Sequence, residues 1–68
     1  MDKDKIIMLM EHTIHHNEHH ADDFISLAKD LREKGQEEAA QLAESAAKDV
    51  ESAVAKLIEA KDLYIKNN

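Results

Sequence analysis

A single glycine, Gly35, is the strongest constraint on how this chain folds, because proline is absent and no other residue interrupts a helical pattern. The residues just before it are basic and those just after it are acidic. They are Arg32, Lys34, Glu37 and Glu38. Positive charge at the end of one helix and negative charge at the start of the next complement the two helix dipoles. The sequence therefore predicts two helices joined by a turn at Gly35.

The predicted helices span about 3–34 and about 36–65 and make up one helical-hairpin domain over residues 1–68. A connection this short makes the two helices antiparallel neighbours. The expected fold class is all-α: a two-helix antiparallel hairpin.

The seam where the helices meet is predicted from residues spaced alternately three and four apart. In the first helix these are Ile7, Met10, Ile14, Asn17, Ala21, Phe24, Ala28 and Leu31. In the second they are Ala39, Ala43, Ala46, Val50, Ala53, Leu57, Ala60 and Tyr64, with Ala40, Ala47 and Val54 beside them. Alanine buries little apolar area, so one hairpin alone is expected to be marginal. We expect a homodimer that forms a four-helix bundle.

All five histidines lie between residues 12 and 20, in a segment that also holds four carboxylates and no Lys or Arg. Histidines three or four residues apart on a helix are neighbours and can share a divalent transition-metal ion. The candidate ligands are His12, His15, His16, His19, His20 and Asp23, with Thr13 and Asn17 as groups that could orient them. Without cysteine, the ion would be nickel, zinc, copper or cobalt held by imidazole and carboxylate.

Within this set, the pair His16 and His20 is the favoured site. His20 lies beside the seam, next to Thr13 and Asn17, whereas His12, His15 and His19 fall on the outer side of the helix. Two imidazoles bind weakly, so a tight site needs ligands from another helix or subunit. If the first helices of two copies packed antiparallel, residues near their midpoint would meet, but the sequence leaves the direction open.

Other readings of these residues stay open. Asn17 suits a register-setting polar residue in a helical seam, and the outer histidines suit a solvated helix face.

Charge and length exclude several classes of function. The net charge is −6 and no Lys/Arg cluster exists, so nucleic acid and anionic membranes are poor partners. No apolar run is long enough to span a bilayer, and residues 1–5 do not resemble a signal peptide, so we expect a cytoplasmic protein. No nucleophile motif or phosphate-binding loop is present, and we expect a non-enzyme without catalytic residues.

The motif His16-Asn17-x-x-His20-Ala21-x-x-Phe24 resembles a largely uncharacterised family of small archaeal and bacterial helical hairpins. The resemblance covers about 9–57, although only this core is distinctive. It implies transition-metal handling of the kind associated with nickel-enzyme maturation, with His16, Asn17 and His20 as the shared residues. An aromatic residue expected near Leu9 is missing, and the three outer histidines are specific to this chain.

Two hypotheses of function follow. The first is a metal-binding homodimer that acts as a carrier, buffer or sensor. The second is a structural or protein-interaction hairpin that has a polar Asn/His layer, binds a protein partner, and holds no physiological metal. Metal titration separates them.

Overall fold

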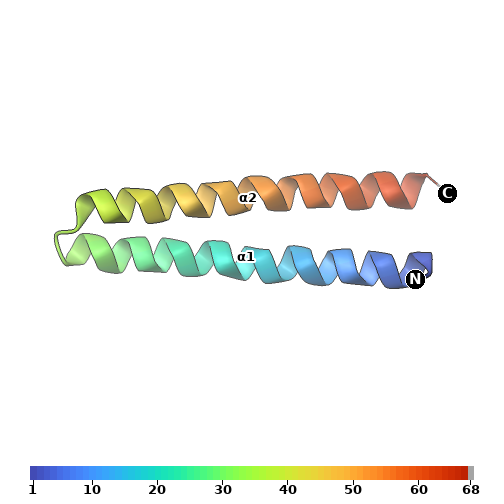
Figure 1. Ribbon diagram of the computed structural model, residues 1–68, viewed down its shortest axis with the longest axis horizontal. Helices are drawn as coiled ribbons and strands as arrows, with labels where there is room; N and C mark the ends of the chain where they lie inside the picture. Colours follow the sequence, from blue (N-terminus) through green and yellow to red (C-terminus); the bar gives the residue numbers. More distant parts are fainter. Residues whose placement is uncertain (68) are drawn as a thin grey trace.

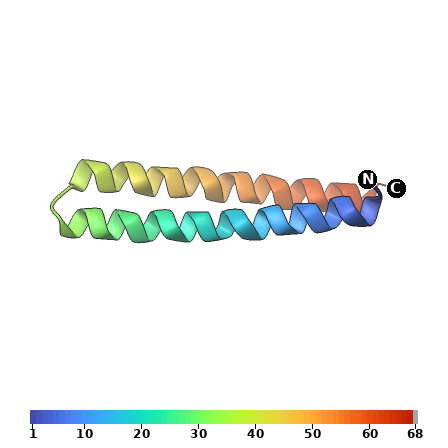
Figure 2. The same cartoon turned by 60° about the horizontal axis from the view of Figure 1, so that its bottom comes forward.

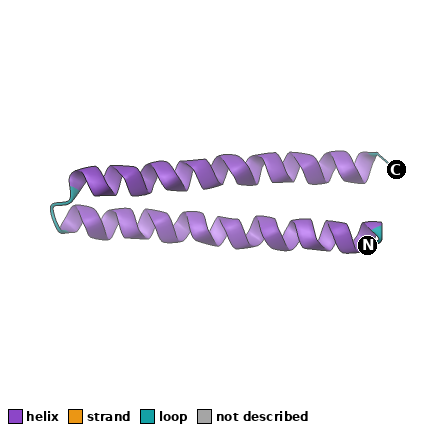
Figure 3. Cartoon of the chain, viewed as in Figure 1, coloured by secondary structure: helices purple, strands orange, loops and turns teal. Residues whose placement is uncertain are grey.

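The computed structural model describes residues 1–67 and shows two antiparallel helices, α1 (Lys3–Glu33) and α2 (Glu37–Lys66), joined by a short turn (Figure 1). Throughout that part of the chain the regular structure is helical (Figure 3). The predicted two-helix hairpin is therefore confirmed. It is a rod of 52 × 15 × 12 Å, and both termini lie at the end opposite the turn (Figure 2). Neither helix, as far as residue 67, carries an apolar stretch suited to crossing a membrane.

The two ends of α1 are closed by local hydrogen bonds. At its start, the Asp2 carboxylate accepts a hydrogen bond from the Lys5 backbone N–H at 2.9 Å, which satisfies one of the free amides of the first turn. At its end, the Gln36 N–H donates to the Leu31 carbonyl at 2.9 Å, and the Gly35 N–H donates to the Arg32 carbonyl at 3.0 Å. These two bonds form a Schellman motif, which requires a left-handed residue between them. Gly35, with φ of +75°, is that residue.

The seam between the helices buries one residue per heptad on each side. These residues are Ile14, Ala21 and Ala28 on α1 and Ala40, Ala47 and Val54 on α2. The predicted seam of α1 is confirmed, because its remaining members are half-buried. Small side chains in these rows allow the helix axes to approach closely, but each contributes little buried area.

The predicted seam of α2 is correct in one of its two rows. Its members Ala43, Val50, Leu57 and Tyr64 are half-buried, whereas the other row lies one residue further along the chain than expected. Ala53 and Ala60, which were expected in the seam, are exposed, and the buried row runs through the residues expected beside it. The cause is the alanine-rich sequence of α2: adjacent alanines such as 39/40 and 46/47 are equally apolar, so periodicity cannot choose between them. Val54, larger than either neighbour, lies in the row that is buried.

The hairpin has two long faces, one on each side of the seam. The residues flanking the seam on one side are Glu11, Glu18, Ile25 and Arg32 of α1 and Glu44, Glu51, Ile58 and Ile65 of α2. Glu18, Ile25 and Glu51 line one shared surface hollow, which places these two rows on the same face. We call it the acidic face. The opposite flanks are Ile6, Thr13, His20 and Leu27 of α1 and Ala39, Ala46, Ala53 and Ala60 of α2, which we call the histidine face.

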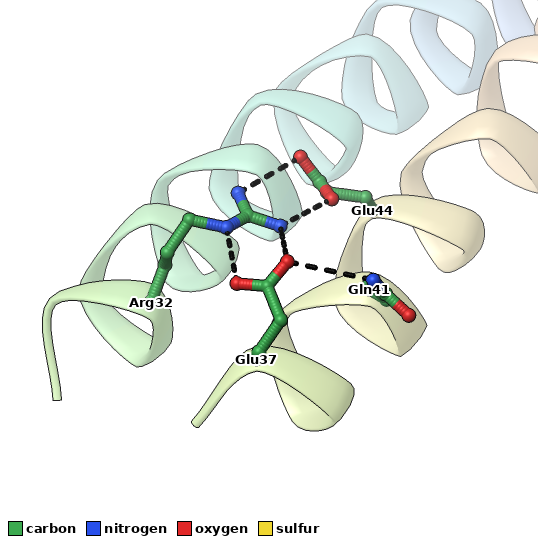
Figure 4. A network of polar contacts seen from close by, with 4 residues as sticks. All are labelled: Arg32, Glu37, Gln41 and Glu44. Atoms are coloured by element: carbon green, nitrogen blue, oxygen red, sulfur yellow. Dashed lines mark hydrogen bonds and ion pairs between the residues drawn. The ribbon is translucent and has the colours of Figure 1, made fainter. Parts of the chain in front are cut away.

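Arg32 links the helices near the turn on the acidic face (Figure 4). Its guanidinium donates to both carboxylate oxygens of Glu37, at 2.8 and 3.1 Å, and to both of Glu44, at 2.8 and 3.2 Å. Gln41 donates a further bond to Glu37 at 3.4 Å. Hydrogen bonds from Arg32 hold the pKa values of Glu37 and Glu44 below their ordinary range. These bonds join the end of α1 to the first two turns of α2.

Replacing Gly35 with alanine should lower the free energy of unfolding by about 1 kcal/mol, because a Cβ is disfavoured at positive φ. No atom lies within 4 Å of the position that this Cβ would occupy, so the cost is conformational rather than steric. Gly35→Asn should cost less. Urea denaturation followed by circular dichroism measures both, with Gln36→Ala as the control, since the Gln36 side chain makes no capping bond. If Gly35→Ala and the control lost the same free energy of unfolding, the requirement for a left-handed residue would be contradicted.

Replacing Arg32 with glutamine should make the melting temperature depend less on pH in the acid range. The lowered pKa values of Glu37 and Glu44 give stability that is present above the ordinary glutamate value of 4.5 and is lost as pH falls through the folded-state values. The melting temperature of Arg32→Gln should therefore lie slightly below that of the wild type at neutral pH and meet it near about pH 3. Lys29→Gln, which removes the same charge from an exposed position, should show no such convergence. If the melting temperatures of Arg32→Gln and the wild type differed by the same amount at all pH values, Glu37 and Glu44 would not be the cause of the difference.

Candidate metal-binding histidines

Two histidine pairs lie along the middle of α1, and the closer one is formed by His16 and His20. Their Nε2 atoms are 2.9 Å apart, and their ring centroids are 4.3 Å apart with the planes nearly perpendicular. The spacing of four residues places the two side chains one above the other on the helix. Both nitrogens therefore point at the same small volume outside the helix.

This pair continues a row of rings that ends at the seam. His20 stacks on Phe24 with centroids 6.3 Å apart, and His12 stacks on His16 at 6.2 Å. Phe24 is half-buried between the helices, and His20 is half-buried beside it, whereas the other four histidines are exposed. A ring held between the seam and its neighbours loses rotamer freedom before any ligand arrives, which lowers the entropic cost of binding. The role of Phe24 as a support for His20 was not anticipated, although its spacing of four residues from His20 was a usable signal.

The second pair, His15 and His19, lies on the outer side of α1. Its Nε2 atoms are 3.3 Å apart and its ring centroids 4.7 Å apart. Both side chains are exposed, so nothing but their mutual contact restrains them.

The separations in both pairs fit two ligands of one transition-metal ion. Two nitrogens each ~2.1 Å from an ion lie about 3.0 Å apart when the angle at the ion is a right angle and about 3.4 Å apart when it is tetrahedral. The observed values of 2.9 and 3.3 Å match these limits. Each pair therefore has the nitrogen spacing that a two-nitrogen chelate would need.

The predicted ligands do not converge into a single centre within the hairpin. Nowhere in residues 1–67 do three or more His, Asp or Glu side chains gather closely enough to hold an ion. Asp23 is exposed and belongs to no such group. One chain therefore offers at most two nitrogens at one point, and any tighter site needs ligands from elsewhere.

Asn17 satisfies its own side chain within α1. Its Nδ2 donates to the backbone carbonyl of Thr13 at 2.8 Å, one turn earlier, in a half-buried position of the seam. This bond joins Asn17 to Thr13, the two residues that were predicted to orient the metal ligands. The Oδ1 atom of Asn17 is left to accept a bond from a partner across the seam or from a histidine ring.

The fold and the paired rings define a class: a small antiparallel helical hairpin with two pairs of neighbouring histidines on its first helix. Residues 6–64, which include most of both helices and all five histidines, match the family described as a domain of unknown function, DUF8180, and the chain belongs to that family. The expectation of a small uncharacterised family is confirmed at this level. Neither the curated proteins nor the solved structures contain a match to this chain.

Replacing Asn17 with leucine should raise the free energy of unfolding by about 1 kcal/mol, because a half-buried seam position gains apolar area. The Thr13 carbonyl can still accept its hydrogen bond from the helix backbone, so the substitution leaves no unpaired group. Urea denaturation of the metal-free protein measures the effect. Asn17→Ala, which removes the amide without adding apolar area, should change stability less. A loss of stability in Asn17→Leu would mean that the amide contributes more than its bond to Thr13.

Proposed function

We propose that this protein binds a divalent transition-metal ion through His16 and His20 and acts as a carrier, buffer or sensor of that ion. The observation that carries the proposal is the 2.9 Å separation of the two Nε2 atoms. Imidazole nitrogen suits nickel, zinc, copper and cobalt alike, and Cu(II) would bind most tightly in a test tube whatever the cell supplies. The protein is a binding protein in this proposal, with no catalytic step.

The position of the pair favours His16 and His20 over His15 and His19. His20 is half-buried and stacks on Phe24, so its ring is oriented by the fold. Ligands that are oriented before binding give tighter sites than freely rotating ones. The outer pair is exposed and surrounded by carboxylates, where it would serve as a weaker second site.

A homodimer completes this proposal. Two imidazoles leave a transition-metal ion with open coordination positions, and a second copy would supply two more. The small core supports the same arrangement, because the six buried residues are alanine, isoleucine and valine, and large apolar side chains stay exposed on both helices. Two hairpins packed as a four-helix bundle would cover part of them.

A second candidate function is a protein-interaction hairpin without physiological metal. A separation of 2.9 Å is also a good N–H···N hydrogen bond between two rings when at least one is neutral. In that case the histidines satisfy each other, and the exposed apolar residues would bind another protein.

Saturating Ni(II) or Zn(II) should raise the melting temperature, because an ion bound only by the folded state stabilises it by mass action. At a hundredfold excess over the dissociation constant the gain is ~2.7 kcal/mol. His20→Ala and His16→Ala should each remove most of the gain, because each leaves a single imidazole of the pair. His15→Ala, the matched variant of the outer pair, and His12→Ala should remove little. Thermal melts with and without metal, together with calorimetric titration, provide the measurement.

Two outcomes of this experiment would reject the proposal. If neither ion shifts the melting temperature and no binding is measured at micromolar concentrations, the second candidate function is the better one. If His15→Ala costs more affinity than His20→Ala, the ion binds the outer side of α1, and His16 and His20 are not the site.

A further inference from the structure

The hairpin exposes more surface than a protein of its mass normally does. Its accessible area is 5281 Å², whereas a compact monomer of 7.7 kDa exposes about 4,300 Å². The excess of roughly 1,000 Å² is close to the ~800 Å² that each partner contributes to an interface of standard size. A second copy covering one face would bring the area to the usual range.

The two faces of the hairpin differ in charge, and this difference selects the face to be covered. Five of the eight residues that define the acidic face are charged, whereas none of the eight that define the histidine face is Asp, Glu, Lys or Arg. Removing charged groups from water is costly unless each finds a partner. The alanine row of α2 also lets a second helix approach closely. The histidine face is therefore the one that a second copy can cover.

The outer edge of this face on α2 is complementary to itself in the antiparallel direction. Along α2 it carries Leu42, Asp49, Lys56 and Leu63 at intervals of seven residues. The midpoint of this helix is close to residue 52, so an antiparallel copy places Leu42 against Leu63 and Asp49 against Lys56. The leucines are 74% and 57% exposed in the single chain, and the other pair has opposite charges. Both contacts favour this pairing.

On α1, whose midpoint is residue 18, the same antiparallel direction pairs residues of two neighbouring rows. Leu9 and Leu27 lie nine residues on either side of it and are 53% and 52% exposed, so each would cover the other across the two-fold axis. His16 and His20 lie two residues on either side of it. The midpoints of the two helices are also level with each other, since residues 18 and 52 are equally far from Gly35. A single two-fold axis therefore gives the pairings on α1 and the pairings on α2 at the same time.

The alternative orientation, with both turns at the same end, is disfavoured by charge. It would set α1 of one copy against α2 of the other, matching residues nearly equidistant from Gly35. Asp23 would then face Asp49, and both are negatively charged. Like charges placed opposite each other suppress an interface.

We propose that two copies of this chain pack through their histidine faces with the turns at opposite ends. The two-fold axis then passes between His16 and His20, and the pairs of both copies form one site of four imidazoles that takes a single divalent transition-metal ion. The proposed packing is argued from the accessible area, the charge difference between the two faces and the positions of the leucines. The binding of an ion at this site rests on the proposed function.

Single cysteines test the packing, because the natural chain has none. Ala53 lies on the histidine face next to the axis, Glu51 lies at the same level on the acidic face, and Lys34 lies at the turn. Under mild oxidation without metal, Ala53→Cys should form a disulfide-linked dimer nearly completely. Glu51→Cys and Lys34→Cys should stay monomeric on a denaturing gel. A dimer of Lys34→Cys would place the turns together, and a dimer of Glu51→Cys would select the acidic face; either result, or the failure of Ala53→Cys to link, overturns the packing.

Metal stoichiometry tests the composite site. Titration of the wild type with Ni(II) or Zn(II) should saturate at one ion per two chains. Ala53→Glu, which places a charge in the interface, should weaken binding about tenfold or more because two of four ligands are lost. Ser52→Glu, on the outer side of the same turn, should leave affinity unchanged. If Ala53→Glu fails to fold, the stoichiometry and the cysteine pattern still decide.

The outcomes separate the two proposals. One ion per chain without cross-linking at residue 53 would keep metal binding and overturn the composite site. Efficient cross-linking at residue 53 with no metal bound would keep the packing and overturn both the four-imidazole site and the proposed function.

Discussion

The close packing of small side chains in the seam is the contact on which the rest of this structure depends. Ala21 and Ala28 face a row that contains Ala40 and Ala47, and these four are among the most buried residues of the hairpin. Alanine lets the helices lie close together, but it removes little apolar area from water. Several larger apolar side chains, among them Leu42 and Leu63, lie outside the seam and are exposed. The hairpin has a well-defined shape with a small core of its own.

The sequence was sufficient for the hairpin, for the seam of α1 and for one of the two rows that form the seam of α2. Gly35 marks a left-handed turn that few other residues can adopt, and the residues of α1 vary enough in size and polarity to define a single buried row. In α2 the alanines at 39/40 and 46/47 offer two rows of equal hydrophobicity. Only the fit of Val54 between the helices decides between them, and that fit is a property of the packed structure.

The candidate site shows a similar boundary between what sequence and structure reveal. Helical spacing was enough to predict that His16 and His20 are neighbours, and they are. It could not show that four of the five histidines form two separate pairs with no common centre, because this depends on rotamers and on which rings find support. Nor could it show that Asn17 bonds to Thr13 within its own helix, since a seam asparagine bonds equally well across the seam.

Polar residues in the middle of an alanine-rich seam have a consequence for how an ion would act on this protein. Asn17 and the half-buried His20 occupy positions where apolar residues would give more stability, so the metal-free state gives up part of an already small hydrophobic contribution. Folding free energies of natural domains are about 5–15 kcal/mol, and small cores lie at the lower end. A gain of ~2.7 kcal/mol from a bound ion would then be a large fraction of the total. Because a site divided between two chains forms only when they associate, the same ion would favour assembly as well as folding. The fraction of chains in the dimer would therefore rise with metal concentration. A sensor needs such a change of state, whereas a buffer needs only affinity for the ion.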